Sequence, residues 1–170
     1  MNNKHHKKDK DRKVFSTKKN KISYFFPLLA FISVSFYIGY DLISNTAQAE
    51  EIMVYKSPTC GCCNKWVKHL EKEDFDVKTK DYRDMKPIKK RFGVKPKFQS
   101  CHTAKVGKYF IEGHVSASDI KKLLKEKPDI KGLSAPGMPM GSPGMEGHRR
   151  DNYSIYAIDK NHNATVYSQY

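Results

Sequence analysis

Residues 52–73 read IMVYKSPTCGCCNKWVKHLEKE, and this stretch decides how the folded part of the 170-residue chain begins. The β-prone run at its start ends at a Ser-Pro-Thr turn. From Cys63 onward the pattern becomes helical, because Trp66, Val67 and Leu70 fall on one face while lysines occupy much of the other. The stretch therefore predicts a short strand that leads directly into an amphipathic helix.

Three of the four cysteines stand where that strand meets that helix, in the run Cys60-Gly61-Cys62-Cys63. The fourth, Cys101, is followed directly by His102. A soluble domain has little packing reason to crowd thiols in this way, whereas thiolates that exchange disulfides or share a soft metal ion must lie close together. The cysteines therefore predict thiol or metal chemistry.

The rest of the pattern predicts one α/β domain. The expected elements are a strand at 75–82, a helix at 87–92, strands at 100–106 and 109–112, a helix from 116 to before Pro128, a Gly/Pro/Met-rich loop at 132–147, and a hairpin of strands 153–158 and 164–167. The order β-α-β-α-β-β-α is that of a thioredoxin-like domain, in which a CxxC pair lies between the first strand and the first helix. We therefore predict a thioredoxin-like fold with a mixed central sheet flanked by helices.

The N-terminal part of the chain has the composition of a targeting segment. Residues 1–21 are basic, and residues 22–40 carry no charge. Ala47-Gln48-Ala49 then has the small-x-small form of a signal peptidase site. We favour cleavage after Ala49, and an uncleaved membrane anchor formed by residues 22–43 is the alternative.

Either alternative divides the chain in the same place. Residues 1–49 form the basic and hydrophobic targeting segment, and residues 50–170 form a single metal-binding domain. The basic flank would stay in the cytoplasm, so the domain is expected to be exported to the periplasm. Contact with a membrane is expected only through the N-terminal segment, if that segment is not cleaved.

The formal net charge of +14 overstates the charge of the exported domain. Residues 1–49 hold nine Lys/Arg and three Asp, so they account for six of these charges and residues 50–170 for eight. The lysines of the domain are interspersed with acids, and no arginine–aromatic cluster indicates nucleic-acid binding. The charge is therefore expected to form a solvated surface, with no nucleic-acid partner.

Four uses of the cysteines compete. Two structural disulfides are common in exported domains, but a Cys62–Cys63 bond would be strained and a Cys60–Cys63 bond would close a very short loop. Structural zinc usually takes two separated CxxC pairs, and this chain has one. A thiol–disulfide oxidoreductase would use Cys60 as nucleophile and Cys63 as resolving thiol. Soft-metal binding, with Cu(I) as the obvious ion, explains the surplus of thiols better, because Cys62 and Cys63 can direct their sulfurs at neighbouring ions.

Methionines and histidines are further candidates for a metal site. Met138, Met140 and Met145 lie in the Gly/Pro-rich loop, where their thioethers would suit Cu(I), although methionine also fills gaps in cores. His102 and His114 are candidate ligands or hydrogen-bond partners of ligands. His69, among polar helix positions, and His162, in a turn, are expected at the surface.

Four motifs of this chain resemble, in order, those of the CopG-type copper-resistance family. They are VYKSPTCGCCNKW from residue 54, SCHTA from residue 100, EGHV from residue 112 and GLSAPGMPMGSPGME from residue 132. The resemblance covers residues 52–159 and implies a small exported thioredoxin-like protein whose cysteines hold Cu(I) in a multinuclear cluster. By position, the resemblance implies the ligands Cys60, Cys62, Cys63 and Cys101. One departure is Ser116, where the family often has proline, and it should affect only the start of the helix.

The leading hypothesis is an exported copper-binding protein that contributes to copper resistance by sequestering or redox-handling Cu(I). Its expected partners are copper ions and other copper-handling envelope proteins. The alternative is a thioredoxin-like oxidoreductase that uses the Cys60–Cys63 pair.

Overall fold

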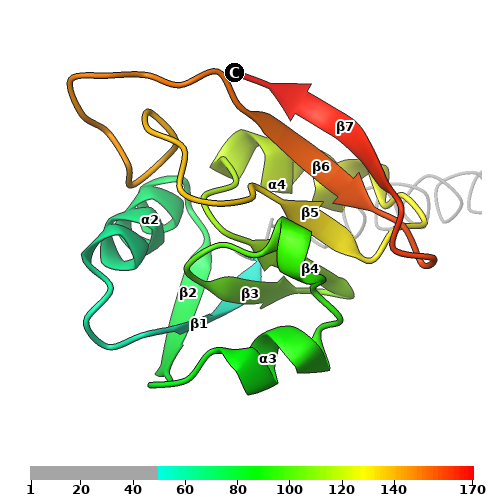
Figure 1. The fold of residues 1–170 in the computed structure, drawn as a ribbon, viewed down its shortest axis with the longest axis horizontal. Helices are drawn as coiled ribbons and strands as arrows, with labels where there is room; N and C mark the ends of the chain where they lie inside the picture. Colours follow the sequence, from blue (N-terminus) through cyan, green and yellow to red (C-terminus); the bar gives the residue numbers. More distant parts are fainter. Residues whose placement is uncertain (1–49) are drawn as a thin grey trace, which may run out of the picture. The chain divides into compact units, whose positions relative to one another are not determined.

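The computed structural model describes residues 50–170, which form one mixed sheet of seven strands with helices on its two faces (Figure 1). The strand order across the sheet is β2-β1-β3-β4-β5-β6-β7. In chain order the elements are β1 (Glu51–Lys56), α2 (Gly61–Lys72), β2 (Asp76–Asp81), α3 (Lys86–Arg91), the 3₁₀ helix η1 (Pro96–Phe98), β3 (Thr103–Val106), β4 (Tyr109–Glu112), α4 (Ala117–Glu126), β5 (Gly132–Ser134), β6 (Ser154–Ile158) and β7 (Ala164–Gln169). The predicted α/β class, with a mixed central sheet flanked by helices, is confirmed.

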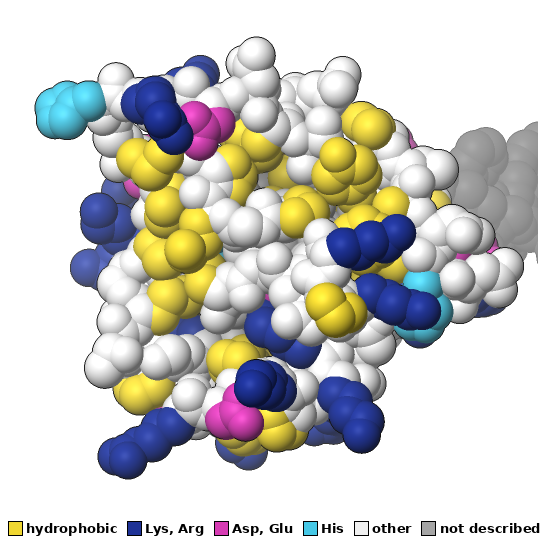
Figure 2. Space-filling view, in the orientation of Figure 1, with side chains coloured by type: hydrophobic (Ala, Val, Ile, Leu, Met, Phe, Trp, Pro, Cys, Tyr) yellow, Lys and Arg dark blue, Asp and Glu magenta, His cyan; other side chains and the backbone are white. Residues whose placement is uncertain are grey.

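The predicted targeting segment, residues 1–49, lies outside the described residues, as do both alternatives for it. Within residues 50–170, no helix has the length and apolar character that crossing a membrane requires. On the face shown in Figure 2, lysine and arginine side chains are scattered among apolar and uncharged groups rather than gathered in one patch.

The larger part of the core lies between the sheet and helices α2 and α4. Trp66 and Leu70 of α2 and Ile120 and Leu123 of α4 are all fully buried there. They pack against the side chains of β1, β3 and β4 that point to the same face, among them Ile111. The helical spacing of Trp66, Val67 and Leu70 in the sequence thus identified the buried face of α2 correctly.

A smaller apolar cluster covers the opposite face of the sheet. It consists of Val94 and Phe98 from the segment after α3, together with Phe110 of β4 and Ile158 of β6. Phe110 and Ile111 are neighbours in β4 and belong to different clusters, because successive side chains of a strand point to opposite faces. Helix α3 and the chain that leads from it to Cys101 therefore lie on the face opposite α2.

Side-chain caps fix the starts of α2 and α4. The sulfur of Cys60 accepts a hydrogen bond from the Cys63 backbone N–H at 3.3 Å, so a cysteine serves as the N-cap of α2. At α4 the Ser116 hydroxyl accepts from the Asp119 N–H at 3.1 Å. Serine is a favourable N-cap, so Ser116, at a position where the family often has proline, leaves the expected helix in place.

Two predicted boundaries are wrong near the cysteine site. The strand expected from Ser100 begins at Thr103, because the Ser100 N–H donates to the side chain of Glu112 instead of to a neighbouring strand. The segment expected to be a loop from residue 132 begins with β5, which pairs in parallel with β4. Gly132 permits that pairing, since a Cβ atom there would overlap the Phe110 backbone.

Candidate metal centre

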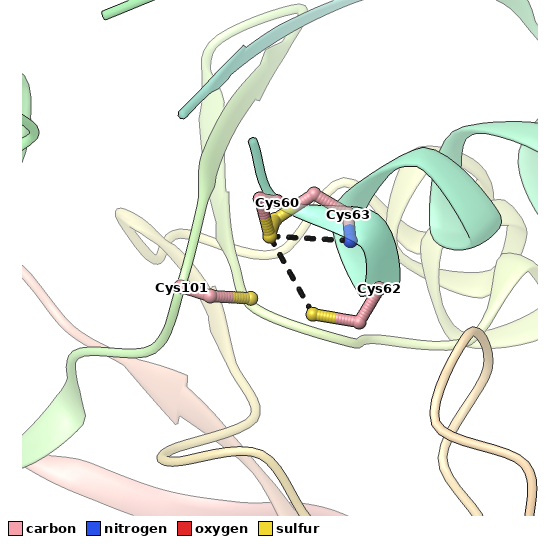
Figure 3. Close-up of side chains that lie close together, drawn as sticks. All are labelled: Cys60, Cys62, Cys63 and Cys101. Atoms are coloured by element: carbon pink, nitrogen blue, oxygen red, sulfur yellow. Dashed lines mark hydrogen bonds between the residues drawn. A yellow bond between two sulfur atoms is a disulfide. The ribbon is translucent and has the colours of Figure 1, made fainter. Parts of the chain in front are cut away.

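The four cysteine sulfurs meet where β1 runs into α2. Cys60, Cys62 and Cys63 stand on the first turn of α2, and Cys101 faces them from the segment before β3 (Figure 3). All four sulfur atoms lie within 4.8 Å of one another. Sulfurs that are 41 residues apart or closer in sequence are thus brought to the spacing that metal ligands need.

Two of the four sulfurs are joined to each other. Cys60 and Cys63 form a disulfide, while Cys62 and Cys101 are free thiols. The sulfur of Cys62 lies 3.5 Å from that of Cys60. A bond that closes so short a loop is a poor structural disulfide, which is why the sequence did not favour it. The first turn of a helix nevertheless brings residues three apart within reach of such a bond. The structure therefore presents the oxidised form of the CxxC pair.

The N-terminus of α2 favours a thiolate at Cys60 once this disulfide is reduced. The Cys63 N–H already points at the Cys60 sulfur, and the helix dipole places partial positive charge at the same point. Both effects stabilise a negative sulfur. An accessible reactive thiolate is useful for disulfide exchange and for metal binding alike.

Cys101 stands between two buried histidines. Its sulfur lies 3.2 Å from His102 Nδ1 and 3.0 Å from His114 Nε2, and both rings are fully buried. These three side chains form a second group whose donor atoms lie within 4.8 Å of one another. Cys101 belongs to both groups, so the four sulfurs and the two imidazoles make one continuous set of donors.

The hydrogen bonds of His114 determine which of its nitrogens is free. Nδ1 lies 2.8 Å from the carbonyl oxygen of Pro143, and because a carbonyl only accepts, Nδ1 carries the proton. In the neutral ring, Nε2 then has its lone pair directed at Cys101. A backbone carbonyl that orients a histidine in this way is the usual companion of a metal-ligating imidazole.

Burial keeps these side chains uncharged. Burial lowers the pKa of His114 and lowers that of His102 well below its usual range. Burial, together with the neighbouring Cys62, raises the pKa of Cys101 to about 12. Neutral imidazoles are ready to bind a metal ion, while Cys101 must lose a proton to do so.

His102 also lies against the single tryptophan of the chain. The ring centroids of Trp66 and His102 are 4.3 Å apart, and Trp66 Nε1 donates to the Val115 carbonyl at 2.8 Å. Nε2 of His102 has no hydrogen-bond partner among the described residues. An unpaired buried nitrogen is costly in an apolar surrounding.

The Gly/Pro/Met-rich loop packs against this centre. Gly144 lies so close to α2 that a Cβ atom would be 2.8 Å from both the Cys62 carbonyl oxygen and the Trp66 nitrogen. The neighbouring residue Pro143 accepts the His114 hydrogen bond. The loop therefore covers the first turn of α2 and fixes one of the two histidines.

The candidate methionines lie on this loop. Met138 is 53% exposed, and Met140 and Met145 are half-buried. The Met145 N–H donates to the Ser142 carbonyl, and the Gly141 N–H donates to the Met145 carbonyl. Their role as metal ligands stays a prediction.

Two features of the site region were not identified from the sequence. Lys89 and Glu112 form a buried ion pair behind Cys101, although the basic run around Lys89 had been assigned to a solvated surface. His69, expected at the surface, is half-buried and accepts a hydrogen bond from the Ala117 N–H. The signal for Glu112 was its place in the EGHV motif, at the end of an otherwise apolar strand.

Comparisons with known proteins agree with this geometry. A family model described as a protein of unknown function, DUF411, matches residues 98–145, which include Cys101, His102, His114 and most of the Gly/Pro/Met-rich loop. No curated protein matches the chain. Two solved structures named copper resistance protein CopG, form 2 and form 1, are each 43% identical to it, with a TM-score of 0.69. Each covers 72% of this chain, and the chain covers 99% and 98% of theirs.

The chain belongs to the CopG copper-resistance family. The resemblance seen in its four motifs is thereby confirmed. In this CopG-family protein, the cysteine cluster has the donor atoms and the spacing of a metal site.

Proposed function

We propose that this CopG-family protein binds Cu(I) through the thiolates of Cys60, Cys62, Cys63 and Cys101, and thereby contributes to copper resistance. The observation that carries the proposal is the grouping of all four sulfurs within 4.8 Å. Thiolates are soft donors and favour Cu(I) over the harder divalent ions. Copper is here the cargo that the protein sequesters or redox-handles.

More than one copper ion would fit the two overlapping donor groups. Cys101 belongs both to the four-cysteine group and to the group with His102 and His114, so its thiolate would bridge neighbouring ions. Adjacent Cys62 and Cys63 likewise favour neighbouring ions over one shared ion. A thiolate-bridged multinuclear site with His114 Nε2 as an additional donor follows from this arrangement.

Reduction must precede binding by all four sulfurs. A dithiol reductant would supply the two electrons and two protons that convert the Cys60–Cys63 disulfide to two thiols, becoming a disulfide itself, and the two thiols would lose their protons as copper binds. Conversely, reoxidation of the pair removes two of the four thiolates. The copper affinity of the site therefore depends on the redox state of the CxxC pair.

The place of action is the periplasm, with export directed by residues 1–49. The combination of a basic segment, an uncharged segment and an Ala-Gln-Ala site supports this part of the proposal. Other copper-handling envelope proteins would supply or receive the ion. Fractionation of cells that express the full chain tests the location, and recovery of the protein in the cytoplasm would contradict it.

The copper-to-protein ratio tests the binding function. The full chain is reduced without a chelator, loaded with Cu(I) under anaerobic conditions, and assayed for bound copper and for thiols open to alkylation. We expect more than one copper per chain and protection of all four thiols. Four fully reactive thiols in a copper-free protein would rule out the proposed site.

One observation favours a second function, thiol–disulfide exchange. Cys60 and Cys63 form a disulfide at the N-terminus of α2, where a thiolate on Cys60 is stabilised. Turnover in a disulfide-reduction assay, retained by a Cys101→Ser variant, would support this function. Copper-free, reduced protein with no such turnover would exclude it.

A further inference from the structure

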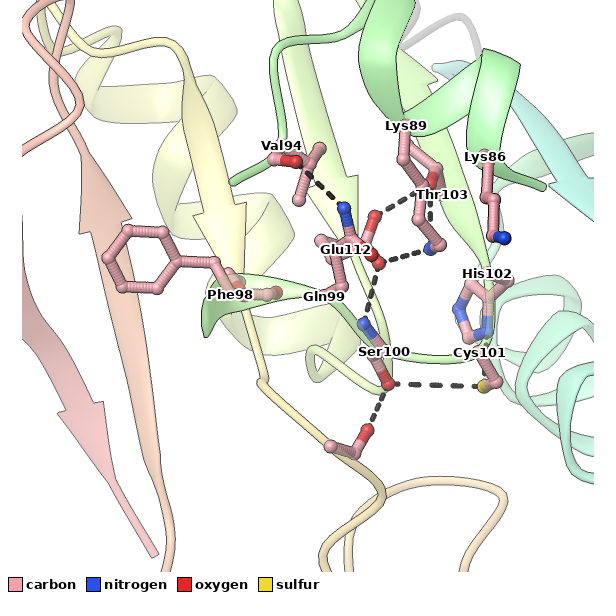
Figure 4. A network of polar contacts seen from close by, with 12 residues as sticks. Lys86, Lys89, Val94, Phe98, Gln99, Ser100, Cys101, His102, Thr103 and Glu112 are labelled. Carbon is pink, nitrogen blue, oxygen red and sulfur yellow. Dashed lines mark hydrogen bonds and ion pairs between the residues drawn. The ribbon is translucent and has the colours of Figure 1, made fainter. Parts of the chain in front are cut away.

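A buried ion pair lies directly behind the segment that carries Cys101. Lys89 of α3 is 5% exposed and Glu112 at the end of β4 is 0% exposed, and the Lys89 ammonium donates a hydrogen bond to Glu112 Oε1 (Figure 4). Lys89 Nζ also lies 3.3 Å from Thr103 Oγ1. The pair thus joins α3 to β3 and β4 on the face of the sheet opposite α2.

The carboxylate of Glu112 accepts two further hydrogen bonds. The backbone N–H of Ser100 donates to Oε1 at 2.7 Å, and the Thr103 hydroxyl donates to Oε2 at 2.6 Å. Ser100 immediately precedes Cys101, and Thr103 follows His102. Glu112 therefore holds the chain at both ends of the Cys101–His102 pair.

Ser100 is also held by contacts with the Gly/Pro/Met-rich loop. Its hydroxyl donates to the Gly137 carbonyl, and the Gly137 N–H donates to the Gln99 carbonyl at 3.0 Å. A Cβ atom at Gly113 would lie 2.5 Å from the Cβ of Ser100, so only glycine lets the two segments come this close. Ser100 thus pairs with Gly137 in an isolated parallel β-bridge, and these contacts hold residues 99–102 in place before β3 begins.

The stability of the fold gives little reason to retain such a pair. Moving two charges out of water costs several kcal/mol per ion, and replacing a buried pair with apolar side chains of similar volume is often neutral or stabilising. The hydrogen bonds that the pair makes, however, have a defined geometric result. They set the position of the backbone from which Cys101 and His102 project.

We propose that Lys89 and Glu112 are the positioning residues of the copper site. Glu112 fixes the Ser100 backbone so that the Cys101 sulfur reaches the three sulfurs on α2, and Lys89 compensates the buried charge of Glu112. The inference rests on the proposed copper-binding function, which supplies the reason for holding Cys101 in place.

Two double variants of the full chain separate this role from a general effect on the fold. Lys89→Met with Glu112→Leu removes both charges and the acceptor for the Ser100 N–H. Lys89→Met with Glu112→Gln removes both charges but keeps a side-chain oxygen for that N–H. Glu73→Gln with Lys121→Met is the matched control, because it removes an exposed ion pair that lies away from the site. In that pair, Lys121 Nζ and Glu73 Oε2 are 2.8 Å apart.

Cu(I) affinity is measured by competition with a chromophoric chelator, under conditions in which near-UV circular dichroism shows each variant fully folded. We expect the Leu variant to bind Cu(I) about 10- to 100-fold more weakly, as for other residues that orient metal ligands. The Gln variant and the control should keep the wild-type affinity. In the metal-free protein, alkylation mapped by mass spectrometry should be faster at Cys101 in the Leu variant and unchanged at Cys62.

A folded Leu variant with wild-type affinity and wild-type alkylation of Cys101 would overturn the inference. If the Leu variant does not fold, the Gln variant decides the question, since a tenfold loss there would show that the retained hydrogen bond does not position the site. Wild-type protein that binds no Cu(I) would instead refute the proposed function. In that case the alkylation rates would still test the positioning role by themselves.

Discussion

The Nε2 atom of His114 lies 3.0 Å from the sulfur of Cys101, with its lone pair directed at that sulfur. The two residues are 13 positions apart and stand on either side of the β3–β4 hairpin. The contact connects the cysteines of α2 to a pair of buried imidazoles. It therefore adds nitrogen atoms to the group of potential metal donors.

Removal of the His114 imidazole should weaken copper binding. We expect His114→Gln to lower the Cu(I) affinity about 10- to 100-fold, because the variant loses a donor that the Pro143 carbonyl holds in place. Competition with a Cu(I) chelator measures this effect. His69→Gln is the control, since His69 is half-buried and, like His114, hydrogen-bonded, but lies outside both donor groups. Equal affinities for the two variants would contradict the assignment.

Cys101 should distinguish copper binding from disulfide exchange. Cys101→Ser removes the donor that both groups share, so the bound copper per chain should fall sharply. The Cys60–Cys63 pair is left intact, and any exchange activity of that pair should survive. Bound copper and turnover in a disulfide-reduction assay are measured on the same preparation. A variant that loads as much copper as the wild type would exclude a bridging role for Cys101.

Gly144 should be required for the docking of the loop on α2. Gly144→Ala places a Cβ atom 2.8 Å from the backbone of Cys62 and Trp66, at a φ of +84°. We expect a loss of about 1–3 kcal/mol in the free energy of unfolding, measured with urea. A weaker affinity for Cu(I) should accompany it, because the neighbouring carbonyl holds His114.

Gly107→Ala is the control for Gly144→Ala. Gly107 also has a positive φ, of +51°, but nothing lies within 4 Å of the position of its Cβ. This variant should lose stability from backbone strain while its copper affinity is unchanged. A parallel loss of affinity in both variants would attribute the effect to stability alone.

Acid should destabilise the metal-free protein through its buried histidines. The pKa of His102 and of His114 in the folded protein is lowered from 6.5, so below pH 6.5 the unfolded chain binds protons that the folded protein does not. The stability is therefore present above pH 6.5 and is lost as the pH falls below it. Urea unfolding between pH 5 and 8 measures this slope. His102→Gln should flatten it, and an unchanged slope in that variant would assign the effect to other groups.

The strand-to-helix start of the domain could be predicted because its cause is local. The apolar spacing of Trp66, Val67 and Leu70 and the turn before Cys60 are properties of adjacent residues. The same holds for the Ser116 start of α4 and for the C-terminal hairpin, whose tight turn is held by Asp159 and Asn163. These elements were placed to within a few residues.

The chain around Cys101 could not be predicted in the same way. Ser100 has the sequence of a strand residue, but its N–H bonds to Glu112, 12 positions away. The basic run that contains Lys89 resembles a solvated helix, and the lysine becomes buried only because Glu112 is there to receive it. Long-range pairing of polar groups leaves no periodic pattern in a sequence.

The sequence by itself determined the α/β class, the crowding of three cysteines at one helix start, and the family to which the chain belongs. Only the tertiary structure decided that His114 presents Nε2 to Cys101 and that Glu112 fixes the backbone beside Cys101. The physical reason is that residue type and spacing control local backbone structure, whereas a site shared by α2, β3 and β4 exists only after the sheet has formed.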